Sequence, residues 1–181
     1  MFSVSHSSKE VCLKIEHLWD GSLCVDERLW ADVSLVQNKQ GLLIKTRSLI
    51  LGNQNIPQAP TGTRVEGLWN YDVVEVFLVG PGHQYLEIEL GAGGHFLVLG
   101  FDSIRHCSHT FEMFYPQIYF KQSSEHYWSN EILIPYHMIP ENIRAINAFA
   151  ILSGQFLAYA PVPGEKPDFH QPDHFPFFAL Q

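Results

Sequence analysis

The chain is poor in cysteine, and its three cysteines, Cys12, Cys24 and Cys107, form no CxxC pair. An odd number without a recognisable spacing argues against a disulfide-stabilised secreted domain and favours reduced thiols in an intracellular protein. The N-terminal residues lack a basic stretch followed by an apolar one, so we expect no signal peptide and a cytoplasmic location. No apolar run approaches the roughly 18 residues that a membrane-spanning helix needs.

Positive charge is also scarce, since 11 Lys and Arg face 19 Asp and Glu, which gives a formal net charge of −8. Nucleic acid and anionic membrane surfaces are therefore not expected as partners. The sequence has no GxSxG, P-loop, GxGxxG or HExxH motif. The glycine-rich run at 91–94 precedes a strand rather than a helix, which predicts a turn and not a phosphate-binding loop. We expect no cofactor.

Helical periodicity is nearly absent, and residues 135–143 predict only a short turn or helix between prolines. Short apolar or alternating runs recur instead, which is typical of an antiparallel sandwich or barrel. The tail from residue 161 carries five prolines and predicts irregular chain that packs over a sheet. Strands are predicted at 11–15, 31–35, 42–51, 72–79, 84–90, 96–101, 111–121, 127–134, 145–152 and 155–160.

Polar side chains gather on two successive strands in the middle of the chain. Trp69 precedes an apolar strand that carries Glu75, and Tyr85, Glu87 and Glu89 alternate with aliphatic residues on the next strand. One interpretation is a solvated sheet face, which alternation alone predicts. The other is that the two strands pair and their carboxylates share a face. There they would bind a cation or sugar hydroxyls, or perform acid–base chemistry on a glycoside.

Asp72 and Glu75 lie three positions apart, so on one strand they point to opposite faces unless the strand start is bulged. Glu75 shares its face with apolar residues such as Phe77. A buried carboxylate there needs a partner or a shifted pKa. Arg64, in the long loop at 53–67, and Arg47 are both candidate partners, and the sequence does not choose between them.

A second polar cluster lies near the C-terminus, where Asp168, His170, Asp173 and His174 fall within seven residues. Carboxylates and imidazoles can hold a divalent metal, but this spacing matches no known ligand motif, and we expect no metal. The favoured interpretation is a loop over a concave face that presents Asp168 and His170 to a ligand.

Several segments, spread in order over nearly the whole chain, resemble an uncharacterised family of eukaryotic and bacterial proteins. The most distinctive reads Leu-Trp-Asn-Tyr-Asp-Val-Val-Glu-Val-Phe. The segments that resemble this uncharacterised family are residues 14–21, 68–77, 84–90, 94–99, 147–151, 160–163 and 166–170. The family in turn is similar to family 9 carbohydrate-binding modules, which have a DOMON-like β-sandwich.

In family 9 modules a Trp-x-x-Asp-x-Val-Glu pattern opens a central strand, and its tryptophan and glutamate contact sugar. Trp69, Asp72 and Glu75 occupy that pattern here. The resemblance therefore implies that Trp69 stacks on a ligand, whereas the alternative is a tryptophan that anchors the core or a loop. The modules clamp their ligand between two tryptophans. Candidates for the second aromatic in this chain are Phe169, His170 and Phe175.

These observations predict an all-β, single-domain antiparallel β-sandwich over residues 1–181, jelly-roll-like and of the carbohydrate-binding-module type, with 161–181 packed irregularly on a sheet. The expected function is non-catalytic binding of a small polar ligand, a saccharide before others, at the concave face. Two alternatives stay open: an enzyme whose carboxylates act on a sugar, and a protein-interaction module with exposed aromatics near the C-terminus. The expected ligand-binding residues are Trp69, Asp72, Glu75, Tyr85, Glu87, Arg64 and His170.

Overall fold

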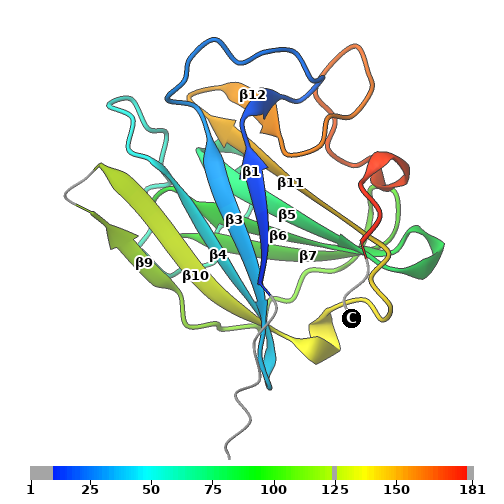
Figure 1. Ribbon diagram of the computed structural model, residues 1–181. Coiled ribbons are helices and arrows are strands. Elements are labelled where there is room, and N and C mark those ends of the chain that lie inside the picture. Colours follow the sequence, from blue (N-terminus) through cyan, green and yellow to red (C-terminus); the bar gives the residue numbers. More distant parts are fainter. Residues whose placement is uncertain (1–9, 124–125, 179–181) are drawn as a thin grey trace, which may run out of the picture.

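Two antiparallel sheets lie face to face in a computed structural model that describes residues 10–123 and 126–178 (Figure 1). The smaller sheet has the strand order β1 (Glu10–Ile15), β3 (Ala31–Gln37), β4 (Gly41–Leu49), β10 (Tyr127–Pro135), β9 (Tyr119–Gln122). The larger sheet has the order β2 (His17–Leu18), β12 (Gln155–Ala158), β11 (Ala145–Leu152), β5 (Val73–Val79), β6 (Tyr85–Gly91), β7 (Phe96–Ser103), β8 (His106–His109). The predicted all-β sandwich is confirmed.

Helical structure in the described residues is limited to four short 3₁₀ turns. None of the helices there is long and apolar enough to cross a membrane. The turn predicted at 135–143 is present as η3. The four turns are η1 (Leu68–Asn70), η2 (Pro81–His83), η3 (Tyr136–Met138) and η4 (Pro172–His174).

The burial of each strand follows its sequence pattern. β3 and β10 alternate buried and partly exposed side chains, as strands with one solvated face do, whereas β5, β6 and β11 are buried at every position. The three fully buried strands form the middle of the larger sheet. Their inner faces pack against the smaller sheet to form the main core, which includes Val74, Val76, Leu78, Leu86, Ile88, Leu90, Ile44 and Ile132.

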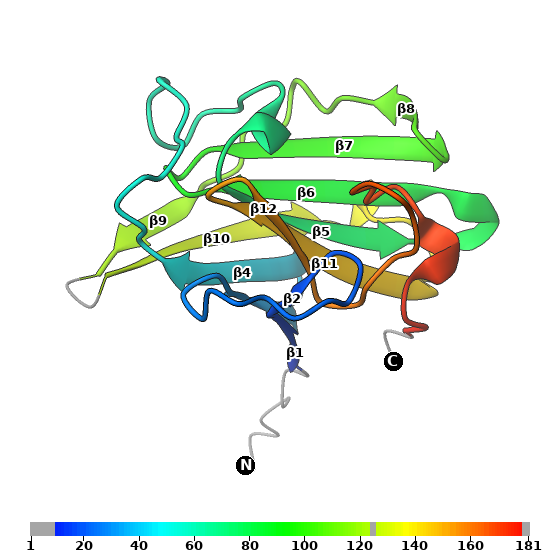
Figure 2. The same ribbon diagram turned by 90° about the horizontal axis from the view of Figure 1, so that it is seen from above.

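The outer face of the larger sheet is covered by the C-terminal segment 161–178, which we call the strap, and by η1. In Figure 2 the strap, coloured orange to red, lies across the middle strands of this sheet. The Phe169 ring stacks on Phe149 of β11 with centroids 4.1 Å apart. Val162 and Phe175 of the strap are also buried against this face. The strap therefore gives the sheet a second, smaller apolar cluster.

Two interpretations of the sequence fail. The strand predicted at 111–121 is wrong over most of its length, because β9 begins only at Tyr119 and β8 pairs with β7 just before this segment. Phe111 has φ of 47°, which extended chain does not allow, and Phe114 N–H donates to the Phe111 carbonyl in a turn. The solvated face predicted for β6 is also wrong, because the strap and η1 cover that face.

Candidate functional site

A cavity of about 660 Å³ opens on the outer face of the larger sheet, between the strap, η1 and the β7–β8 turn. This volume lies within the usual range of small-molecule sites, about 300–1,000 Å³. Its floor comes from β5, β6 and β7, and its walls come from the loops. The lining includes Glu66, Trp69, Asn70, Glu75, Glu87, Leu99, Phe101, Arg105, Cys107, Thr110, Phe156, Asp168, Phe169 and His170.

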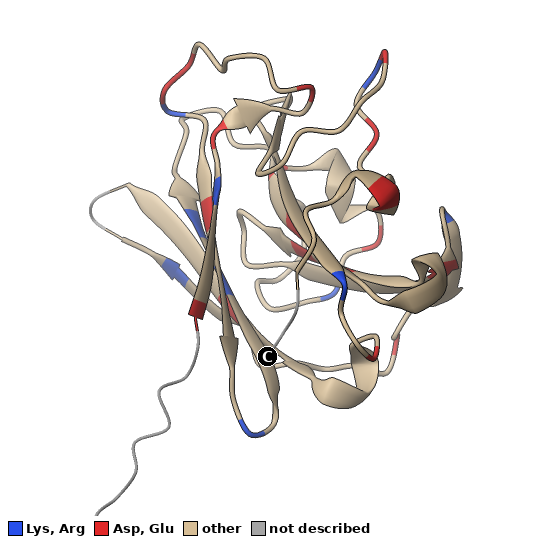
Figure 3. Cartoon of the chain, turned by 45° about the vertical axis from the view of Figure 1, so that its right-hand side comes forward, with Lys and Arg blue, Asp and Glu red and all other residues tan. Residues whose placement is uncertain are grey.

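Glu75 and Glu87 lie on the cavity floor, and Glu89 lies beside them on the same face. Glu75 of β5 pairs directly with Glu89 of β6, while Glu87 is its diagonal neighbour. In antiparallel sheets the Cβ atoms of directly paired residues are about 4.5–5.5 Å apart, and the backbones of diagonal neighbours are about 7–8 Å apart. Acidic positions occur within strands as well as in loops (Figure 3). The predicted shared carboxylate face is therefore present, but it is buried rather than solvated.

The burial of these three carboxyl groups changes their protonation. Removal from water raises the pKa of Glu75 well above its usual range, and the nearby Glu87 adds to the shift. Burial likewise raises the pKa of Glu87 to about 8, although the Arg105 charge opposes this. Burial and the charges of Glu75 and Glu87 raise the pKa of Glu89. At neutral pH the floor therefore holds largely protonated carboxyl groups, which can donate as well as accept hydrogen bonds.

Trp69 lines the cavity from η1 and remains 43% exposed. Its neighbour Leu68 is fully buried in the cluster under the strap and anchors the turn. The Asn70 side chain donates to the Gly67 carbonyl at 3.0 Å and closes the same turn. The turn is thus fixed by Leu68 and Asn70, which leaves the Trp69 indole free for a ligand. A role as a core tryptophan is excluded by its exposure.

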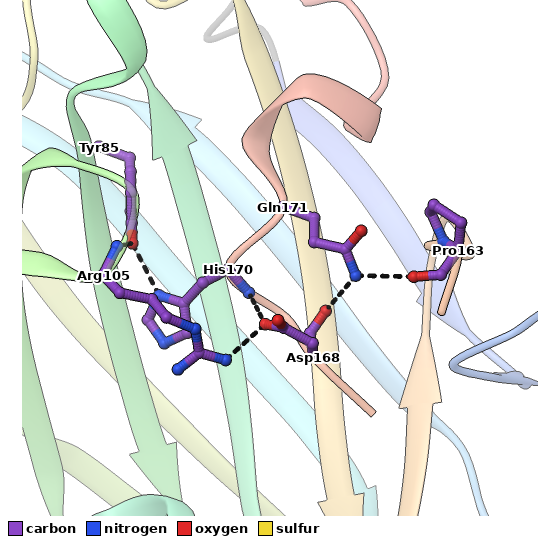
Figure 4. Close-up of polar contacts among 6 residues, drawn as sticks. All are labelled: Tyr85, Arg105, Pro163, Asp168, His170 and Gln171. Carbon is purple, nitrogen blue, oxygen red and sulfur yellow. Dashed lines mark hydrogen bonds and ion pairs between the residues drawn. The ribbon is translucent and has the colours of Figure 1, made fainter. Parts of the chain in front are cut away.

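His170 and Asp168 reach the cavity from the strap and are tied to the sheet by a polar network (Figure 4). The Tyr85 hydroxyl shares a 2.7 Å hydrogen bond with His170 Nδ1 and accepts one from the Arg105 backbone N–H. The Arg105 guanidinium contacts Asp168 Oδ1 at 2.6 Å, and the same oxygen accepts a hydrogen bond from the His170 backbone N–H. Gln171 donates to the Asp168 and Pro163 carbonyls. The network fixes how the strap crosses the face.

Burial also sets the protonation of the two aromatic members of this network. It lowers the pKa of His170 to about 4, and the charge of Arg105 acts in the same direction. Burial raises the pKa of Tyr85 to about 12. At neutral pH His170 is therefore a neutral imidazole and Tyr85 a neutral phenol, so their bond joins two uncharged groups.

Three of the predicted ligand-binding residues do not line the cavity. Tyr85 is buried, and its hydroxyl bonds His170. Asp72 is also buried, and its Oδ1 accepts a hydrogen bond from the Ser153 N–H at 3.0 Å, so it joins the start of β5 to the β11–β12 turn. Burial raises the pKa of Asp72, and the Ser153 bond opposes that shift. Arg64 forms an ion pair with Glu66 and donates a hydrogen bond to the Thr110 carbonyl, and both of these residues line the cavity.

Neither arginine considered as a partner of Glu75 forms an ion pair with it. Arg64 pairs with Glu66 at 2.7 Å, and Arg47 pairs with Asp32 on the other sheet at 2.8 Å. The sequence predicted that the side chains of Asp72 and Glu75 point to opposite faces of the strand. Their positions agree with this prediction, because only Glu75 lines the cavity.

Sequence reasoning missed Arg105 and Phe156. Arg105 lies in the tight turn between β7 and β8 with φ of 61°, and only the pairing of these strands brings it over β6. Phe156 lies in a strand that the sequence predicted correctly, but the sequence pattern of that strand does not show that Phe156 lines a cavity. Of the proposed second aromatics, Phe169 and His170 line the cavity, whereas Phe175 of the strap is buried against the sheet and does not line it.

The other members of the C-terminal cluster point elsewhere. Asp173 contacts His83 of η2 at 2.9 Å, outside the cavity lining. Over residues 10–123 and 126–178, no three His, Cys, Asp or Glu side chains come together in a way that could hold a metal ion.

Comparison with curated proteins finds relatives along nearly the whole chain. The zebrafish (Danio rerio) UPF0462 protein C4orf33 homolog is 33% identical and the match covers 92% of this chain and 88% of the relative. The mouse (Mus musculus) homolog is 31% identical, over 92% of this chain and 90% of its own length. The human (Homo sapiens) UPF0462 protein C4orf33 is 30% identical, over 91% and 86%. The chain belongs to the UPF0462 family.

No family model matches the chain. Among solved structures, a candidate carbohydrate-binding protein from Bacteroides uniformis superposes with a TM-score of 0.71, over 94% of this chain and 86% of the other. Only 13% of residues are identical, so this similarity establishes a shared fold for the UPF0462 chain.

Proposed function

We propose that the cavity on the outer face of the larger sheet binds a small saccharide without transforming it. The observation that carries the proposal is one cavity that joins the half-exposed indole of Trp69 to the buried carboxyl groups of Glu75 and Glu87. An aromatic face suits the apolar C–H face of a sugar ring, and carboxyl groups suit its hydroxyls.

Two further observations support the proposal. The sequence pattern around Trp69 and Glu75 resembles the sugar-contacting strand of family 9 carbohydrate-binding modules. The fold is shared with a candidate carbohydrate-binding protein. Fold similarity alone is a weak guide to function, so the residues of the cavity carry the argument.

A second aromatic wall completes this model of the site. Phe156 and Phe169 both line the cavity. Phe169 is stacked on Phe149, so at most one of its faces is left for a ligand. In the proposed complex a sugar ring stacks on Trp69, and its hydroxyls contact Glu75 and Glu87.

A thermal-shift panel of mono- and oligosaccharides tests the proposal on the wild type, Trp69→Ala and Trp30→Ala. Trp30 is a partly buried tryptophan away from the cavity and serves as a matched control. A ligand at 100 times its Kd adds about 2.7 kcal/mol of stability. We expect a saccharide shift that survives in Trp30→Ala and is lost in Trp69→Ala. A flat panel, or equal loss in both variants, would overturn the proposal.

Glycoside hydrolysis is the alternative that the geometry also favours. Glu75 and Glu87 are diagonal neighbours on one sheet face, a placement whose backbone separation is about 7–8 Å. Glycoside hydrolases likewise use two neighbouring carboxyl groups, about 5–9.5 Å apart. The raised pKa of Glu87 suits a general acid. Product analysis of any bound oligosaccharide separates the two functions. Turnover that disappears in Glu87→Gln would identify an enzyme. An oligosaccharide that binds and is recovered unchanged would support non-catalytic binding.

A further inference from the structure

The charged groups at the edge of the cavity already have partners. Arg105 Nη2 lies 2.6 Å from Asp168 Oδ1, and Arg64 Nη1 lies 2.7 Å from Glu66 Oε2. Asp168 and Glu66 both line the cavity. Each edge carboxylate is therefore matched by one guanidinium, so the charges of the two arginines are balanced at the edge, although the buried Arg64 Nε lacks a hydrogen-bond partner in the described residues.

The carboxyl groups on the floor have no such partners. Glu75 and Glu87 are 2% and 3% exposed and make no hydrogen bond or ion pair within residues 10–123 and 126–178. Both oxygens of the adjacent Glu89 are buried and lack hydrogen-bond partners in the same part of the chain. Burial of carboxyl groups without partners costs free energy. A bound group that hydrogen-bonds to them would offset part of that cost.

Aromatic rings form much of the remaining lining. Trp69, Phe101, Phe156 and Phe169 all contribute to the cavity, and Trp69 has the most exposed ring. The faces of aromatic rings carry partial negative charge and attract ammonium groups within about 6 Å. Rings and carboxyl groups together favour a cation over an anion.

We infer that the ligand of this cavity is a small amine, held with its ammonium group at Glu75 and Glu87 and its apolar part on Trp69. The inference rests on the proposed function, under which the ligand is an amino sugar rather than a neutral or acidic one. An ammonium group donates three hydrogen bonds to the floor carboxyl groups. Its positive charge favours their ionised form and offsets the repulsion between Glu75 and Glu87 when they release their protons. A uronate or a sugar phosphate carries a negative charge, which disfavours that ionised form.

Isothermal titration at pH 6.5 tests the inference with four probes: glucosamine, N-acetylglucosamine, glucuronate and spermidine. The first two share one ring and differ in the charged amine, which isolates the charge. Glu87→Gln and Glu75→Gln keep side-chain size and remove the ability to ionise when an ammonium group binds, and the exposed Glu27→Gln is the matched control. We expect glucosamine to bind at least tenfold more tightly than N-acetylglucosamine, and glucuronate to show no binding. The preference should vanish in Glu87→Gln and persist in Glu27→Gln.

The outcomes separate this inference from the proposed function. Equal binding of both neutral and amino sugars, with dependence on Trp69, would overturn the inference and leave saccharide binding in place. Binding of spermidine without any sugar would support a cation site and overturn the saccharide proposal. A response to Ca²⁺ or Mg²⁺ alone that is lost in Glu87→Gln would overturn the inference in favour of a metal site.

Discussion

The two faces of β5 and β6 are buried to the same degree but differ in chemistry, because the outer face combines apolar side chains such as Phe77 with three carboxyl groups. The inner face presents aliphatic side chains such as Val76 and Ile88 to the smaller sheet. The outer face presents Glu75, Glu87 and Glu89, all at most 3% exposed. The inner face is covered by a whole sheet, whereas the outer face is covered by the strap, which leaves a cavity at its edge.

This difference shows that burial has two different consequences in one sheet. On the inner face each aliphatic side chain that leaves water contributes favourable free energy, about 25 cal/mol per Å². On the outer face each carboxyl group that leaves water opposes folding unless it stays protonated or finds a partner. The inner face therefore stabilises the fold, and the outer face carries the site.

The largest expected effect separates the two faces directly. Ile88→Ala removes a fully buried side chain from the inner face and should destabilise the protein by about 2–5 kcal/mol in urea unfolding at pH 7. Glu87→Gln, one residue away on the outer face, should not lower stability, because it replaces a buried acid with a neutral amide of the same size. Equal destabilisation by both substitutions would mean that Glu87 stabilises the fold as much as an inner-face side chain does.

The next effect is on the pH dependence of stability. Because the pKa values of Glu75, Glu87 and Glu89 are raised in the folded state, the folded protein retains protons that the unfolded chain has released. Stability is then greatest below the unfolded pKa, near 4.5, and falls as pH rises toward 8, by up to about 1.4 kcal/mol per pH unit for each group.

Urea unfolding at pH 5, 6, 7 and 8 measures this slope. Glu87→Gln should flatten it by the share of one group, and the exposed Glu27→Gln should leave it unchanged. His170 contributes with the opposite sign: its pKa is lowered to about 4, so its stabilisation is lost as pH falls from about 6.5 to 4. A wild-type curve that rises from pH 5 to pH 8 would contradict the protonated floor.

The same contrast explains what the sequence could predict. The alternation at 84–90 placed Glu87 and Glu89 on one face, and the interpretation that this strand pairs with 72–79 added Glu75 to the same row, which the register confirms. Alternation distinguishes one face from the other but does not say what covers each. The outer face was therefore open to interpretation as solvated until the strap was placed upon it.

The cavity walls were harder to predict, because they depend on contacts between distant segments. Asp168 and His170 were expected over the concave face from their loop composition. Arg105 was not, because it reaches the cavity only through a two-strand turn whose position follows from sheet pairing. The segment before β9 was misassigned because its aromatic residues are typical of strands, while its turn at Phe111 is set by a positive φ.

The smallest expected effect concerns how the strap is held on the outer face. Arg105 and Asp168 join the β7–β8 turn to the strap, but their side chains are 58% and 34% exposed. An ion pair this accessible to water contributes at most about 1 kcal/mol. Arg105→Gln should therefore lower stability by less than that, with Lys166→Gln, an exposed strap residue, as the matched control.

Arg105→Gln should also act on His170 through charge. Because the Arg105 guanidinium helps to lower the pKa of His170, its removal should raise that pKa above about 4, while burial keeps it below 6.5. Imidazole ¹⁵N chemical shifts measure the change, and amide exchange at Ile146, whose N–H donates to the Pro176 carbonyl of the strap, reports whether the strap stays in place. Protection at Ile146 should persist, since the Phe169 ring remains stacked on Phe149. Loss of that protection would mean that the ion pair, and not aromatic packing, closes the outer face.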